Sequence, residues 1–237
     1  MLQKHTSTQF DAQLEHVRAE VLRMGGAVED QLSLAVRALQ VGDMYLIERV
    51  LDAENRVNAL EMEIDELCTN IIARRTPTAI DLRVVTMVVK TITDLERIGD
   101  EAKKIALMAR EFFRSGRGYM PRYGELRRMS EIAIDMLRQS LDGFARLDAD
   151  AAPAVARRDL EVDDSFRAVL RELLTYMIED PRTISATLDI VFIAKALERV
   201  GDHAKNISEY VVYMIKGKDV RHLSAEEIEQ AVRSERL

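Results

Sequence analysis

The 237 residues include 34 basic and 41 acidic side chains, and the net charge of −7 argues against a general attraction to nucleic acid or anionic lipid. The single cysteine, Cys68, excludes an intramolecular disulfide and leaves too little thiol for a zinc ribbon or an iron–sulfur cluster. The N-terminus lacks the apolar run of a signal peptide, and no stretch approaches the ~18 apolar residues of a membrane span. We therefore expect a cytoplasmic protein with no membrane insertion and no nucleic-acid partner.

Apolar residues recur at alternating steps of three and four through the first half, which predicts three long helices. The expected helices are 6–40, 43–74 and 79–113. Gly42 and Asp43 separate the first two, Thr76-Pro77 breaks the chain, and Thr78 is expected to cap the third helix. The predicted seam of this third helix consists of Leu82, Val85, Val88, Ile92, Leu95, Gly99 and Ala102.

A Gly- and Pro-containing linker at 115–121 precedes a second set of helical patterns. The expected helices are 122–148, 150–179 and 183–216, with a turn at Asp180-Pro181 and a stop at Gly217. A capping box that begins at Ser224 predicts one short final helix. Because short connections force successive helices to pack antiparallel, we predict an all-α fold of two tandem antiparallel three-helix bundles. The expected divisions are 1–114, the linker 115–121, 122–217, and a C-terminal tail, 218–237.

The two halves share a sequence motif. Residues 95–103 read LERIGDEAK and residues 197–205 read LERVGDHAK, so seven of nine positions match at an offset of 102. This match indicates duplication of a three-helix unit. A glycine stands at the same place in both copies, Gly99 and Gly201. Because glycine inside a helix costs about 1 kcal/mol relative to alanine, we expect a close neighbour there, either a packed helix or a cation cluster.

Each motif carries two acids four residues apart, on one face of its helix. In the first repeat these acids are Glu96 and Asp100, which lie 19 and 23 residues after Pro77. The same distances before Pro77 lead to Asn58 and Glu54. Equal distances from the turn of an antiparallel hairpin lie at equal height, so the two pairs should be level.

The second repeat gives the same arrangement. Glu198 and Asp202 lie 18 and 22 residues after residue 180, whereas Asp163 and Asp159 lie 17 and 21 residues before it. Converging carboxylates repel one another without a cation, and oxygen ligands suit hard metals. We therefore predict one metal site per hairpin; Fe, Mg, Mn, Ca and Zn are not distinguished. The alternative is inter-helix salt bridging. Its expected basic partners are Arg56, Arg97, Arg158 and Arg199.

Two copies of LERxGDxAK, each after a helical hairpin, resemble the PhoU family of accessory and regulatory proteins of the phosphate-specific transport system. The resemblance spans about 6–217 and includes the turn from Arg75 to Arg83, RTPTAIDLR. In that family E(D)xxxD motifs bind metal clusters, which implies the same role for Glu96/Asp100, Glu198/Asp202 and Asp159/Asp163. The matching first-repeat pair is Glu54/Asn58, where the neutral Asn58 implies a weaker site.

The resemblance also implies a biological role. Such proteins are cytoplasmic, often form homodimers, and repress the phosphate-starvation response by linking an ABC-type phosphate transporter ATPase to a sensor histidine kinase. No general base, histidine ligand or pocket-forming loop accompanies the acids, so we do not expect an enzyme. The competing hypotheses are a carboxylate-bridged metalloenzyme, a helical adaptor without metal, and an accessory protein of a different phosphate carrier.

Overall fold

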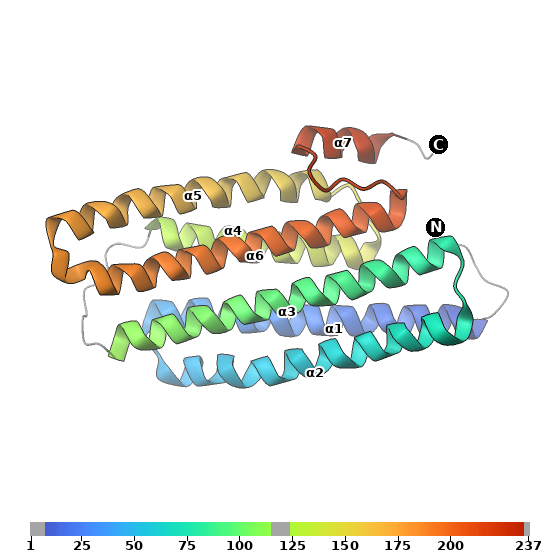
Figure 1. Ribbon diagram of the computed structural model, residues 1–237, viewed down its shortest axis with the longest axis horizontal. Helices are drawn as coiled ribbons and strands as arrows, with labels where there is room; N and C mark the ends of the chain where they lie inside the picture. The colour runs from blue at the N-terminus through green and yellow to red at the C-terminus, as the bar shows by residue number, and fades with distance from the viewer. Residues whose placement is uncertain (1–7, 115–123, 235–237) are drawn as a thin grey trace.

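The computed structural model describes residues 8–114 and 124–234, and helices make up most of them (Figure 1). The first three helices are α1 (Thr8–Val41), α2 (Met44–Arg75) and α3 (Ala79–Arg114). The next three are α4 (Gly124–Arg146), α5 (Ala152–Glu179) and α6 (Ile184–Lys216), with the 3-10 turn η1 (Pro181–Thr183) before α6. The last is the short α7 (Ala225–Arg233). Each long helix lies within two residues of its expected bounds, whereas the predicted linker, 115–121, lies outside the described residues.

Local capping explains where several helices begin and end. The Asp43 side chain accepts a hydrogen bond from the second residue of α2, as an N-cap does. Gly217 ends α6 with φ at +73°, a left-handed conformation that favours glycine. The predicted capping box at the start of α7 is confirmed, because Ser224 and Glu227 each accept a hydrogen bond from the other's backbone N–H.

The start of α3 differs from expectation in one respect. The Thr78 carbonyl accepts from the N–H of Leu82 and the Thr78 hydroxyl donates to the Asp81 carboxylate, while the predicted side-chain cap of Thr78 stays a prediction. The prediction that Leu82 belongs to the buried seam is wrong, since this side chain is 42% exposed. An α-helix drifts by ~20° per seven residues relative to a strict heptad seam. The buried face at this end of α3 therefore lies on Asp81 and Val84.

The helices form two three-helix bundles, α1–α3 and α4–α6, which meet along α3 and α6 (Figure 1). These two helices run antiparallel through the middle of the molecule, and α1 also contacts α4. One continuous apolar core contains residues of all six long helices. The predicted fold class is confirmed. The expected division of the chain at 115–121 stays a prediction.

Polar contacts join the two bundles along the α3–α6 interface. The buried Asp94 carboxylate lies 2.6 Å from Nδ1 of His203 and accepts a hydrogen bond from Asn206 at 3.2 Å. Two turns further along α3, the buried Glu101 lies 3.1 Å from the Arg199 guanidinium. A buried carboxylate needs partners at defined positions, so these contacts fix the register of α3 against α6.

The C-terminal segment packs on the second bundle. Helix α7 lies against α5, and its apolar residues Ile228 and Val232 join a small separate cluster with Val212 of α6. Of the described helices, none combines the length and apolar character needed to cross a membrane.

Candidate functional site

The α5–α6 hairpin brings its four predicted acids together. The pKa of Asp202 is raised to about 6, first by desolvation and then by repulsion from Glu198, Asp159 and Asp163, although the side chain as a whole remains exposed. The pKa of Asp163 is also raised, by desolvation and by the charges of Asp159 and Glu198. The equal-height argument therefore located these side chains correctly, and their role as metal ligands stays a prediction.

Lysines neutralise half of this cluster. Lys205 donates to the buried Asp159 at 2.9 Å, and Lys195 lies 2.5 Å from Glu198 one turn along α6. The carboxylates with raised pKa values, Asp163 and Asp202, are the two outside these ion pairs. The cluster thus keeps an excess of negative charge that a cation would neutralise.

In the α2–α3 hairpin, Glu54, Glu96 and Asp100 also lie within electrostatic reach of one another. Desolvation and the charges of Asp100 and Glu54 raise the pKa of Glu96. Glu54 is buried, accepts a hydrogen bond from Gln31 of α1 at 3.0 Å and lies 3.6 Å from Lys103. The fourth predicted residue, Asn58, lies exposed on α2 one turn beyond Glu54.

Sequence reasoning missed Glu61, which supplies a further acid to this first cluster. Burial raises the pKa of Glu61, and the charges of Glu96, Asp65 and Asp100 raise it further. The signal was present, because Glu54, Asn58, Glu61 and Asp65 form a row at helical spacing, but equal distances from Pro77 lead only to Glu54 and Asn58. Glu61 gives the first cluster a carboxylate despite the neutral Asn58.

The repeated motif places its lysine and its glycine against the same acid in each hairpin. Lys103 and Lys205, 102 residues apart, pair with the buried acid of the preceding helix. A Cβ at Gly201 would lie 3.6 Å from Asp159 Oδ1, and one at Gly99 would lie 3.8 Å from Glu54 Oε2. The expected close neighbour of each glycine is therefore the packed preceding helix, with its acid facing the glycine.

The glycines differ in the space beside them, which predicts opposite effects of alanine. A Cβ at Gly99 would lie 3.1 Å from Oε1 of the buried Gln31, whereas the contacts at Gly201 are ordinary ones of 3.6 Å. Helix propensity favours alanine by about 1 kcal/mol at both sites. We expect Gly201→Ala to raise the free energy of unfolding by about 0.5–1 kcal/mol and Gly99→Ala to lower it by about 1 kcal/mol through overpacking. Urea unfolding of the matched pair measures both; equal changes would contradict this account.

The donor set fits an oxygen-seeking cation in type and in charge. Its members are carboxylates, the ligands that hard metals prefer. Within residues 8–114 and 124–234, no group of three or more His, Cys, Asp or Glu side chains is arranged closely enough to hold one ion. In the structure Lys195 and Lys205 form ion pairs with two of the four acids of the second repeat, where a metal ion would otherwise neutralise them. Metal binding is therefore supported by chemistry and stays a proposal.

Lysines as well as expected arginines form the salt bridges of the two hairpins. Of the arginines proposed as partners, Arg97 lies 3.6 Å from Glu96. Arg158 pairs with Asp135 and Arg199 pairs with Glu101. The motif lysines, Lys103 and Lys205, together with Lys195, supply most of the neutralising charge in the hairpins.

Comparison with known proteins places the chain in a family. A family model described as the PhoU domain matches it twice, over residues 21–109 and 126–211. The chain is 47% identical over 225 residues to the "phosphate-specific transport system accessory protein PhoU homolog" of Pseudomonas putida, covering 94% of this chain and 86% of the relative. It is 44% identical to the "phosphate-specific transport system accessory protein PhoU" of Escherichia coli K12, covering 97% and 94%.

A solved structure agrees with these sequence comparisons. The crystal structure of PhoU from Pseudomonas aeruginosa superposes with a TM-score of 0.85 at 46% identity, covering 88% of this chain and all of that one. Both copies of the motif lie inside the matched residues, one in each match. The chain therefore belongs to the PhoU family.

Proposed function

We propose that this protein is a cytoplasmic, non-enzymatic regulator of phosphate uptake and of the phosphate-starvation response. The observation that carries the proposal is similarity over nearly the full length of proteins named for the phosphate-specific transport system, at 44–47% identity. We further propose that it acts as a homodimeric helical adaptor between the ATPase of an ABC-type phosphate transporter and a sensor histidine kinase. The transporter would signal sufficiency through this adaptor, and the kinase would stay repressed.

Features of the surface support an adaptor role. Apolar side chains lie exposed on the halves of α5 and α6 nearest their connecting turn, among them Ile178 at 80%, Phe192 at 59% and Leu174 at 54%. Exposed apolar patches mark sites of protein contact. We propose that metal ions, of identity not yet distinguished among Mg, Mn, Ca, Fe and Zn, neutralise the two carboxylate clusters and stiffen the hairpins on which such contacts depend.

The second candidate is a carboxylate-bridged metalloenzyme. The observation that favours it is Asp202, whose pKa of about 6 lies in the range of a general acid or base. Turnover of a phosphate ester that is lost in Asp202→Asn would support this candidate. Absence of turnover with metal-loaded protein would leave the regulator as the working function.

A genetic complementation experiment tests the regulator. In the source organism, deletion of the gene should switch on a phosphate-starvation reporter in phosphate-rich medium, and the wild-type gene should restore repression. Purified transporter ATPase and kinase should each retain the purified protein in a pull-down. An unchanged reporter after deletion would refute the regulatory role, and repression without binding to either partner would refute the adaptor mechanism.

A further inference from the structure

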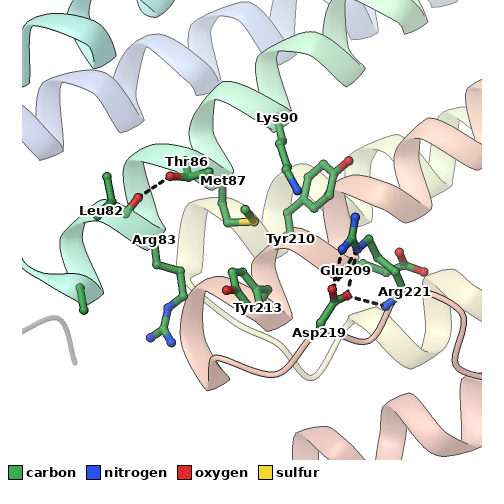
Figure 2. Close-up of a pocket in the computed structure, with 11 residues that line it drawn as sticks. Leu82, Arg83, Thr86, Met87, Lys90, Glu209, Tyr210, Tyr213, Asp219 and Arg221 are labelled. Carbon is green, nitrogen blue, oxygen red and sulfur yellow. Dashed lines mark hydrogen bonds and ion pairs between the residues drawn. The ribbon is translucent and has the colours of Figure 1, made fainter. Parts of the chain in front are cut away.

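A pocket lies at the end of the α3–α6 interface, about two helical turns from the carboxylate clusters (Figure 2). The beginning of α3 and the end of α6 form its walls, and the loop between α6 and α7 closes one side. Its volume of about 390 Å³ falls within the ~300–1,000 Å³ of small-molecule sites. The pocket is therefore large enough for a small ligand.

Two cations of α3 line this pocket without a carboxylate partner. The Arg83 guanidinium lies 5.8 Å from the ring centre of Tyr213, and the Lys90 ammonium lies 5.6 Å from that of Tyr210. Within the part of the chain that the structure describes, neither forms a salt bridge, and the buried Nε of Arg83 has no hydrogen-bond partner. Both cations therefore keep the capacity to bind an anion.

The acidic groups of the pocket oppose an anion only weakly. Asp219 forms a two-point ion pair with Arg221, at 2.9 and 2.6 Å, and these hydrogen bonds hold the pKa of Asp219 at about 2. Arg221 thus compensates most of the Asp219 charge, and the Lys90 charge contributes a smaller part. Burial raises the pKa of Glu209 to about 7, so this side chain is partly neutral near physiological pH. Three basic and two acidic side chains line the pocket, so its lining carries an excess of positive charge.

A structural role explains one of the two cations but not the other. Nη1 of Arg83 lies 2.2 Å from where a Cβ of Gly217 would stand, so Arg83 covers the C-terminal end of α6. A positive charge at the C-terminal end of a helix interacts favourably with the helix dipole. Lys90 lies two turns away along α3 and has no such helix end to cover. Its position beside Tyr210, inside the pocket, calls for a different explanation.

We propose that this pocket binds a dianionic phosphoryl group, held by Arg83 and Lys90. Two cations that line one pocket match a doubly charged oxyanion in charge, and the arginine fork suits tetrahedral oxygens. The tyrosine rings leave an apolar wall for the remainder of a larger ligand. The group belongs either to free inorganic phosphate or to a small phosphorylated metabolite. The assignment is independent of the proposed function.

Titration calorimetry of the full chain tests the site with inorganic phosphate, sulfate, adenosine monophosphate and chloride. We expect saturable binding of the dianions and none of chloride. Lys90→Gln and Arg83→Gln should each weaken binding by about tenfold, the loss of one charge-assisted hydrogen bond. Glu209→Gln should strengthen dianion binding, because the substitution removes an acidic side chain that repels the anion. The matched control is Arg49→Gln, an exposed site on α2 that changes the net charge equally.

The results separate the two sources of the phosphoryl group. Tighter binding of adenosine monophosphate than of phosphate identifies a phosphorylated metabolite, and equal or weaker binding identifies free phosphate. Helical circular dichroism and thermal unfolding check each variant. If Arg83→Gln fails to fold, Lys90→Gln carries the test alone, since Lys90 covers no helix end. No saturable binding of any dianion at millimolar concentration, or equal affinities of Lys90→Gln and Arg49→Gln, would overturn the proposal.

Discussion

Asp202→Asn is expected to stabilise the metal-free protein and, at the same time, to weaken its binding of divalent cations. In the α5–α6 cluster Asp202 is repelled by Glu198, Asp159 and Asp163, and its pKa of about 6 reflects this cost together with desolvation. Removing the charge should raise the free energy of unfolding in chelator by about 1 kcal/mol, less than the pKa alone implies because solvent screens an exposed group. Loss of an anionic ligand should lower affinity by at least about tenfold.

Urea unfolding with chelator and with added Mn²⁺ measures both effects on the same two proteins. The control is Asp164→Asn, which removes one negative charge from the residue next to Asp163 on α5. The Asp164 side chain is exposed and paired with Arg167. Metal should stabilise the wild type and Asp164→Asn alike, and Asp202→Asn much less. Identical responses of the two variants to Mn²⁺ would remove Asp202 from the metal site.

Glu209→Gln is expected to remove a large part of the pH dependence of stability between pH 4.5 and 8, to which Asp202 also contributes. Burial raises the pKa of Glu209 from 4.5 to about 7, so the folded state binds the proton more tightly than the unfolded state does. The stabilisation is fully present below pH 4.5 and is lost as the pH rises through 7. The wild type should therefore lose about 2–3 kcal/mol across this range relative to the variant.

The measurement is urea unfolding at pH 5 and pH 8 for the wild type, for Glu209→Gln and for Glu179→Gln, an exposed glutamate at the end of α5. At pH 8 the Glu209→Gln protein should be the most stable of the three. A wild-type slope that persists in Glu209→Gln would show that Glu209 is not the group responsible.

The helices were predictable from the sequence because their signals are local. Each signal acts within a few residues: the apolar period, the breaks at Thr76-Pro77 and Asp180-Pro181, and the capping box that begins at Ser224. Each predicted helix is present. The acids of each hairpin were also predictable, because equal distances from a short turn are equal heights. Asp159 and Asp202 accordingly lie together, although 43 positions separate them in the numbering.

Features that depend on helix rotation were less predictable. Periodicity placed Leu82 in the core, but the drift of the helical period turns it outward, where it lines the pocket of Figure 2. The rule of equal distances from the turn also overlooked Glu61, which reaches the first cluster from the next turn of α2.

By itself, the sequence determined the six long helices, their duplication and the two acid-bearing hairpins, since all of these follow from periodicity, breakers and an internal match. Only the tertiary structure decided how α3 meets α6. That interface joins residues about a hundred positions apart, such as Asp94 and His203, through contacts that no local pattern encodes. The same interface creates the pocket between Lys90 and Tyr210, because a cavity exists only where two separately formed surfaces fail to fill the space between them.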